Sequence, residues 1–226
     1  MQYENIREAK FISRPNRFIA HIEIDGKEEI CHVKNTGRCK ELLVRGATVF
    51  VQEVSSEKRK TKYDLLGVYK GEKLINIDSQ APNKIFHEWM VESDFFSDIN
   101  FIKPECQYQK SRLDFYLETS SRKIFAEVKG VTLEKNGVVL FPDAPTERGI
   151  KHINELCRAI SEGFEAYLVF IIQMKEVLYF TPNRETHPAF AEAVLNAFNR
   201  GVKIIALDCE VAADSIVARN FVEVRI

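Results

Sequence analysis

The sequence has few of the features that mark secreted, membrane-spanning or zinc-binding proteins. Its five cysteines are scattered, odd in number and form no CxxC pair, which argues against a disulfide framework or a structural zinc site and suits a reducing compartment. No apolar run approaches the ~20 residues that span a bilayer. The first residues, MQYENIREAKF, lack the apolar core of a signal peptide. We therefore expect a cytoplasmic protein with no membrane partner.

A strong net charge is also missing. The formal net charge is −1 over 226 residues, so no global basic field indicates a nucleic-acid partner. Residues 1–80 hold 15 lysines and arginines against 12 acidic residues, and the remainder holds 17 against 21. Ordinary surface scatter is one explanation of this asymmetry. The other is that the N-terminal part faces a polyanion.

Residues 1–80 have the pattern of a small β-domain. Alternating segments at 17–24 and 28–33 flank Asp25-Gly26, a strong hairpin signal. Further strands are expected at 47–54, 63–69 and 73–78, with one brief helix around CKELL. Five short strands and a brief helix predict a small, partly closed barrel of the OB type. A five-stranded sandwich would give the same pattern.

Residues 81–226 alternate between helices and strands. A helix is expected over 81–92, with Pro82 near its start, and a second helix is capped by Thr146 and stopped by Gly163. The run EAYLVFIIQ indicates a strand buried on both faces. This pattern predicts an α/β domain with a mixed central sheet flanked by helices. The sequence thus divides into domains at 1–80 and 81–226.

The stretch SRLDFYLETSSRKIFAEVKG, residues 111–130, predicts a hairpin with charges in unusual places. If facing residues sum to 241, Leu113, Phe115 and Leu117 share one apolar face, and Asp114 lies opposite Glu127. An odd loop without a bulge would spoil both faces, because a shift of one residue exchanges them. The apolar pattern therefore selects the register that brings the two carboxylates together.

Opposed carboxylates repel each other, and a bound divalent cation would remove that repulsion. Hard ions such as Mg²⁺ take one or two carboxylates, carbonyl oxygens and water, which Asp114, Glu127 and the carbonyl of Val128 can supply. Lys129 points to the same side as Glu127 and can stabilise charge on a phosphate oxygen. Glu88, on the helix over 81–92, is a candidate third carboxylate. The alternative is a solvated sheet face, because most ExK patterns are exposed strand pairs.

Two basic segments are candidates for binding nucleic acid. The loop KRKTK supplies Lys58, Arg59, Lys60 and Lys62 between two strands of the expected barrel. The helix start TERGIKH can hold a phosphate through free backbone N–H groups and through Arg148, Lys151 and His152. Arg112 lies beside the carboxylates of the hairpin. The alternatives are a solvated loop and a solvated first helical turn.

Several of these motifs occur together, in this order, in one known family. They are NTG at 35–37, KRK at 58–60, PNK at 82–84 with Glu88, SRLDF at 111–115, EVK at 127–129, FPDA at 141–144 and TERGIKH at 146–152. The chain therefore resembles the sugar fermentation stimulation protein A family over nearly its whole length. The resemblance implies an OB-like domain followed by a PD-(D/E)XK nuclease-like domain. It also implies non-specific DNA binding and a role in regulating maltose and sugar utilisation.

In the nuclease superfamily that the resemblance implies, the matching Asp and Glu bind metal, the Lys assists catalysis, and a helix Glu often joins them. Those roles would fall to Asp114, Glu127, Lys129 and Glu88, with Mg²⁺ or Mn²⁺ as the cofactor. Our main hypothesis is a non-specific DNA-binding protein with a nuclease-like metal site. One alternative is a metal-dependent nuclease or phosphodiesterase, and another is a small-molecule sensor at the domain junction.

Overall fold

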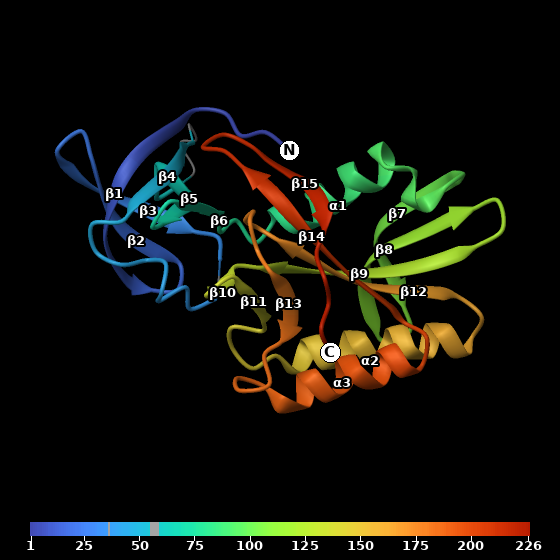
Figure 1. Ribbon diagram of the computed structural model, residues 1–226. Coiled ribbons are helices and arrows are strands. Elements are labelled where there is room, and N and C mark those ends of the chain that lie inside the picture. Colours follow the sequence, from blue (N-terminus) through green and yellow to red (C-terminus); the bar gives the residue numbers. More distant parts are fainter. Residues whose placement is uncertain (36, 55–58) are drawn as a thin grey trace.

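The chain folds into two lobes (Figure 1), and this computed structural model describes residues 1–35, 37–54 and 59–226. The N-terminal lobe contains β1 (Ile6–Asn16), β2 (Ile19–Ile24), β3 (Lys27–Val33), β4 (Thr48–Glu53), β5 (Tyr63–Lys70) and β6 (Lys73–Asn76). The larger lobe contains α1 (Ala81–Glu92), the 3₁₀ turn η1 (Asp94–Phe96), β7 (Ile99–Tyr108), β8 (Ser111–Thr119), β9 (Lys123–Val131), β10 (Leu133–Lys135), β11 (Val138–Phe141), α2 (Glu147–Ser161), β12 (Glu165–Ile172), β13 (Tyr179–Pro182), α3 (Pro188–Asn199), β14 (Lys203–Val211) and β15 (Ile216–Phe221). None of the helices in these described ranges is long and apolar enough to cross a membrane.

The N-terminal lobe is an OB-like barrel, as the sequence predicts. Its strands follow the order β3-β2-β1-β4-β5, and a parallel pairing of β3 with β5 closes the barrel. The hairpin between β2 and β3 turns on Asp25 and Gly26, both with positive φ, as expected of a two-residue turn. Strand β6 continues from β5 and lies outside the closed barrel.

Two features of this barrel differ from the prediction. The sequence did not predict strand β1. Only two of its residues, Ala9 and Phe11, are buried, and the charged side chains and Pro15 around them hide the alternation that marks a strand. The segment CKELL, expected as a brief helix, forms turns instead. The five strands of the barrel therefore include β1, whereas the sequence pattern predicted β6 as the fifth strand.

The second lobe is built on a mixed six-stranded sheet in the order β15-β14-β12-β9-β8-β7, which confirms the predicted α/β architecture. Strand β12 pairs in parallel with both β9 and β14 and is buried along almost its whole length. Helix α1 covers one face, and α2 and α3 lie side by side across the other (Figure 1). All five cysteines are free and buried, so they serve as small apolar side chains of these cores.

Helix α2 begins and ends where its sequence signals place it. The hydroxyl of the N-cap Thr146 accepts a hydrogen bond from the Gly149 N–H at 3.1 Å. The helix stops before Gly163, whose φ of 88° suits the left-handed backbone that ends many helices. This placement fixes the face of α2 that lies over β9.

A buried polar network joins the two lobes. The side-chain amide of Gln173, directly after β12, donates to Asn76 Oδ1 at 2.8 Å and to the carbonyl of Asp78 at 3.0 Å. The backbone N–H of Asn76 donates to the Gln173 carbonyl at 3.0 Å. Because buried polar groups cost free energy when they lack partners, this network fixes the junction in one arrangement.

We expect Gln173→Ala to destabilise the protein by about 1–3 kcal/mol, because it removes two buried hydrogen bonds and leaves each acceptor with a single backbone donor. Thermal unfolding of the two proteins measures the effect. The matched control is Gln107→Ala, whose side chain bonds only to an exposed carbonyl in its own turn and should change stability by less than about 0.5 kcal/mol. Equal shifts for both variants would contradict the role of the junction network.

Candidate metal centre

The hairpin formed by β8 and β9 has the register that the sequence predicts. Phe115, Tyr116, Leu117 and Glu118 pair with Ala126, Phe125, Ile124 and Lys123. The pairing ends there, however, so Asp114 and Glu127 are not a directly opposed pair. Instead, Asp114 Oδ2 accepts a hydrogen bond from the backbone N–H of Val128 at 2.8 Å. The two strands therefore separate at the carboxylates. There the Asp114 side chain, instead of a backbone carbonyl of β8, accepts the hydrogen bond of the Val128 N–H.

Strand β8 is irregular at Asp114 on both sides. On the β7 side, pairing runs from Pro104↔Phe115 to Cys106↔Leu113 and omits the position between them, where Glu105 has a φ of 50°. Leu113 then packs in the core on the α2 and α3 side, whereas Phe115 packs on the α1 side. The strand thus rotates at Asp114, which explains why the predicted single apolar face of β8 is divided between two cores.

The Asp114 carboxylate lies between the sheet and helix α1. Its Oδ1 accepts a hydrogen bond from the side-chain amide of Asn83 at 3.0 Å. Burial raises the pKa of Asp114, and the nearby Glu127 carboxylate raises it further. Asn83 belongs to the PNK motif, whose contribution to the centre could not be assigned from the sequence. The effect of Glu127 on the pKa of Asp114 shows that the two carboxylates are close enough to repel each other.

Glu127 is buried, and only one of its two carboxylate oxygens has hydrogen-bond partners among the described residues. Its Oε1 accepts hydrogen bonds from both Lys129 Nζ and His152 Nδ1. Its Oε2 is buried and has no hydrogen-bond partner among the residues that the structure describes. Burial raises the pKa of Glu127, but the bonds from His152 and Lys129 outweigh it and bring the pKa below its ordinary value. Glu127 is thus held as a carboxylate with one oxygen free to bind a cation.

This donor set fits a hard divalent cation. Within the described ranges, no three His, Cys, Asp or Glu side chains gather closely enough to form a complete metal cluster. A site of two carboxylates completed by carbonyl oxygens and water is nevertheless the arrangement that Mg²⁺ commonly takes. Glu127 Oε2, which has no partner among the described residues, is the atom that such an ion would satisfy. The carbonyl of Val128 as a further ligand stays a prediction.

Glu88 lies on α1, on the wall of the same cavity as Asp114. Its Oε2 accepts a hydrogen bond from the amino group of Met1 at 2.5 Å, so it is already engaged by a cation. The described side chains do not bring Glu88 into a three-carboxylate cluster with Asp114 and Glu127. Its role as a metal ligand stays a prediction.

The cations of the KRKTK loop differ in their surroundings. Lys58 lies outside the described residues. Arg59 forms an ion pair with the buried carboxylate of Asp64, and Lys62 pairs with Glu53 at 3.0 Å. Lys60 is exposed and forms no ion pair within the described part of the chain. This loop therefore offers fewer free cations than its sequence indicates.

The basic residues of the second segment, TERGIKH, and of the neighbouring strand β8 also differ in their surroundings. Arg148 is exposed, and Lys151 donates to the carbonyl of Lys110 at 3.0 Å. Arg112 is exposed on β8 and pairs with Glu105 at 3.5 Å. His152 is buried under Glu127 rather than exposed at the helix start. Since one helical turn places residue 152 on the sheet side of α2, His152 belongs to the metal centre's surroundings.

The turn that carries Gly37 and Arg38 connects the barrel to the second lobe. The Arg38 N–H donates to Asp143 Oδ2 at 2.9 Å, and the Gly37 N–H donates to Asn35 Oδ1 at 2.7 Å. A Cβ at Gly37 would lie 2.6 Å from Asp143 Oδ2 and 2.8 Å from Asn35 Oδ1. Gly37 of the NTG motif therefore lies against Asp143 of the FPDA motif, and the absence of a side chain on the glycine permits that contact.

We expect Gly37→Ala to destabilise the protein by about 1–3 kcal/mol, because the new methyl group displaces the Asp143 carboxylate from the Arg38 N–H. Thermal unfolding measures the shift. The control is Gly67→Ala in β5, where a Cβ would meet its nearest neighbour at an ordinary 3.5 Å. A Gly37 variant as stable as the Gly67 variant would show that the turn does not need this close approach.

Comparison with known proteins assigns both lobes to one family. Residues 12–77 match the model of the SfsA N-terminal OB domain, and residues 80–215 match that of the sugar fermentation stimulation protein RE domain. The chain is 64% identical to the sugar fermentation stimulation protein homolog of Desulfitobacterium hafniense, over all of this chain and 99% of the relative. It is 58% identical to the homolog of Clostridium beijerinckii, over 99% of each chain.

A solved structure resembles the whole chain. It is described as the structure of Pyrococcus furiosus SfsA in complex with Ca²⁺. The two proteins are 30% identical and superpose with a TM-score of 0.91, over all of this chain and 98% of the other. The arrangement of barrel, mixed sheet and helices is therefore shared with that protein.

Proposed function

This chain belongs to the sugar fermentation stimulation protein family, and we propose that it is a non-specific DNA-binding protein with a divalent-metal centre at Asp114 and Glu127. One observation carries the proposal: Glu127 Oε2 is buried, belongs to a carboxylate kept ionised by its neighbours, and has no partner in the described structure. Such an atom is costly unless a cation or water satisfies it. The neighbouring Asp114 carboxylate makes a cation the better match.

The identity of the cation follows from the donors. Carboxylate and carbonyl oxygens favour Mg²⁺, Mn²⁺ and Ca²⁺ over metals that prefer sulfur or imidazole. The relative from Pyrococcus furiosus is described as a complex with Ca²⁺, which supports a hard cation here. Asp114, Glu127 and the Val128 carbonyl would hold it, and His152 and Lys129 would orient Glu127.

DNA is the proposed partner because both lobes carry exposed cations that have no acidic partner among the residues described by the structure. Arg148 on α2 and Lys60 near β5 are examples. Contacts of Lys and Arg with phosphates give affinity without sequence preference. A role in regulating sugar utilisation is a further proposal, which is supported by the family's name alone.

A second candidate function is hydrolysis of a phosphodiester, and the position of Lys129 favours it. Its ammonium group lies at Glu127 and is only slightly exposed. There it can donate a hydrogen bond to an oxygen that gains negative charge as the phosphorus–oxygen bond breaks. A bound Mg²⁺ or Mn²⁺ would supply Lewis-acid polarisation of the phosphoryl group.

One gel experiment separates these functions. Labelled single- and double-stranded DNA is incubated with the protein or its Glu127→Ala variant, with Mn²⁺ or with EDTA. Retarded DNA supports binding, and fragments formed only by the unaltered protein with Mn²⁺ support hydrolysis at this centre. Migration of both DNAs as free species at low salt would contradict the proposed function.

A further inference from the structure

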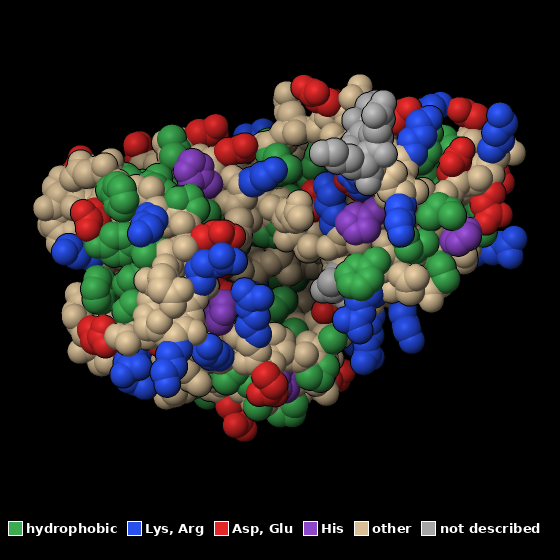
Figure 2. All heavy atoms as spheres, turned by 180° about the vertical axis from the view of Figure 1, so that it is seen from behind, with side chains coloured by type: hydrophobic (Ala, Val, Ile, Leu, Met, Phe, Trp, Pro, Cys, Tyr) green, Lys and Arg blue, Asp and Glu red, His purple; other side chains and the backbone are tan. Residues whose placement is uncertain are grey.

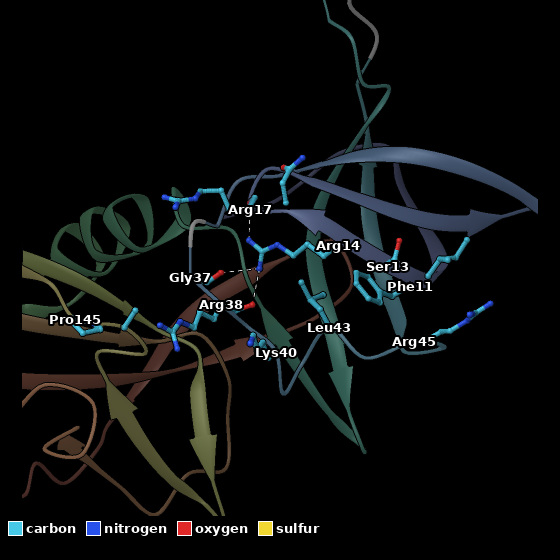
Figure 3. Close-up of a pocket in the computed structure, with 13 residues that line it drawn as sticks. Phe11, Ser13, Arg14, Arg17, Gly37, Arg38, Lys40, Leu43, Arg45 and Pro145 are labelled. Carbon is cyan, nitrogen blue, oxygen red and sulfur yellow. Dashed lines mark hydrogen bonds between the residues drawn. The ribbon is translucent and has the colours of Figure 1, made fainter.

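The barrel carries a basic cavity that the sequence motifs do not indicate. It has a volume of about 800 Å³ and lies between β1, the loop that follows β3, and Ala144 and Pro145 of the second lobe. No acidic residue is among its described lining residues. Its wall contains five cations, whose side chains Figure 3 shows around the cavity: Arg14, Arg17, Arg38, Lys40 and Arg45.

The charge of this cavity is not neutralised by neighbours. Arg17, Arg38, Lys40 and Arg45 are exposed and form no ion pair with any residue in the described ranges. Arg14 instead points toward the turn that carries Gly37 and Arg38 (Figure 3). It donates to four backbone carbonyls, those of Arg17, Asn35, Gly37 and Arg38, at 2.6–2.9 Å. Its Nε is buried and has no partner in that same part of the structure.

These residues give the cavity a positively charged wall, in which the hydrogen bonds of Arg14 hold its guanidinium in place. Because Arg14 bonds to neutral carbonyls and to no carboxylate among the described residues, it organises the turn and keeps its full charge. The other four cations surround it and remain available to a ligand. In a chain of net charge −1, such a concentration favours an anion with several negative groups.

The basic cavity adjoins two further cavities that lead toward Asp114 of the metal centre. A smaller cavity of about 170 Å³ shares the wall residue Gly37 with it and also contacts Ser79. A third cavity, of about 720 Å³, shares Ser79 with the second and is lined by Asp114. Figure 2 shows the hollow between the two lobes, with Lys and Arg side chains on both sides. The three cavities are therefore neighbours along one path, which leads from the barrel across the domain junction to Asp114.

We propose that a single DNA strand occupies this path, with its phosphates in the basic cavity and its backbone leading through the junction to Asp114. This inference rests on the proposed function and adds where the strand lies. The cavity of about 170 Å³ has room for about five or six water molecules at ~30 Å³ each, which suits a sugar–phosphate backbone whose bases lie outside and is too little for a base pair. Its described wall has a single carboxylate, Asp143, which already accepts the Arg38 N–H.

An exposed aromatic residue completes the interface. Phe18 follows Arg17 directly, and its side chain is 51% exposed. Large exposed apolar side chains next to cations are the usual platforms for unpaired bases in single-strand binding proteins. The cavity thus offers charge for phosphates, and Phe18, the chain neighbour of the lining residue Arg17, offers a stacking surface for a base.

The test compares two triple variants of the full-length protein. Arg38→Ala/Lys40→Ala/Arg45→Ala removes cations of the cavity. The control Lys27→Ala/Lys123→Ala/Arg200→Ala removes three exposed cations that lie outside it and form no ion pair with described residues. Fluorescence anisotropy gives the affinity for a labelled single strand and for a duplex across a salt series. Calorimetry with Mn²⁺ checks the metal centre of each variant.

We expect the cavity variant to bind the single strand at least about tenfold more weakly. The slope of log K against log salt should fall by about 2, because each lost phosphate contact on a single strand contributes about 0.7. The control should keep affinity and slope, and both variants should bind Mn²⁺ normally.

Three results would overturn the inference. If the unaltered protein binds DNA but its slope of log K against log salt equals that of the cavity variant, the proposed function stands and this path is excluded. Tighter binding of the duplex than of the single strand would exclude a single-strand passage. Absence of any DNA binding by the unaltered protein would remove the proposed function and this inference together.

Discussion

Replacing Glu127 with alanine should weaken Mn²⁺ binding by more than about 100-fold. Loss of a residue that only supports a ligand typically costs 10- to 100-fold, and Glu127 would be one of two carboxylate ligands. The variant also removes the atom, Oε2, that has no partner in the described structure. Isothermal titration with Mn²⁺ measures the change directly, without requiring an enzymatic activity.

Two further variants keep this prediction testable if the alanine variant unfolds. Glu127→Gln preserves the shape of the side chain but removes its charge, so it should lose the metal while retaining the fold by circular dichroism. Glu118→Gln, at the turn end of the same hairpin, is the matched control and should bind Mn²⁺ normally. An unchanged isotherm for Glu127→Gln would contradict the assignment of this carboxylate.

Replacing His152 with alanine should weaken Mn²⁺ binding by about 10- to 100-fold, although His152 is not itself a proposed ligand. His152 is buried, and its Nδ1 lies in hydrogen-bond contact with Glu127 Oε1. Without it, Glu127 loses one of the two contacts that keep its pKa low and its Oε2 in place. The measurement is again the Mn²⁺ isotherm.

A conservative variant separates positioning from mere stability. His152→Asn can still donate a hydrogen bond and should recover part of the Mn²⁺ affinity, whereas a purely structural role would make affinity follow thermal stability in all variants. The reference is His21→Ala on the barrel, whose exposed pair with Glu28 is remote from the centre. If His152→Ala binds Mn²⁺ as tightly as the His21 variant, the positioning role is wrong.

The site's carboxylates could be predicted because they lie on a hairpin whose register depends on local pattern. The alternation of apolar residues in β8 and β9 selects one pairing, and the structure has that pairing from Phe115 to Glu118. The separation of the strands at Asp114 could not be foreseen, because it accompanies the interrupted pairing at Glu105, which has a positive φ, and the packing of β8 on two faces.

The surroundings of the site depend on contacts that sequence patterns do not contain. His152 reaches Glu127 only because α2 crosses over β9, a placement set by tertiary packing. The basic cavity collects residues from β1 and from the loop after β3, which become neighbours when the barrel closes. The one available signal was the small positive excess of residues 1–80. The conspicuous KRKTK loop, by contrast, uses two of its cations in ion pairs.

The most direct test is a crystal of the protein soaked in Mn²⁺ and measured for anomalous scattering at a wavelength where manganese is visible. The account predicts a peak between the carboxylates of Asp114 and Glu127, within coordination distance of Glu127 Oε2. The same soak of a Glu127→Gln crystal should lack that peak. A peak at other carboxylates only, with Glu127 Oε2 satisfied by an ordered water, would contradict the metal centre.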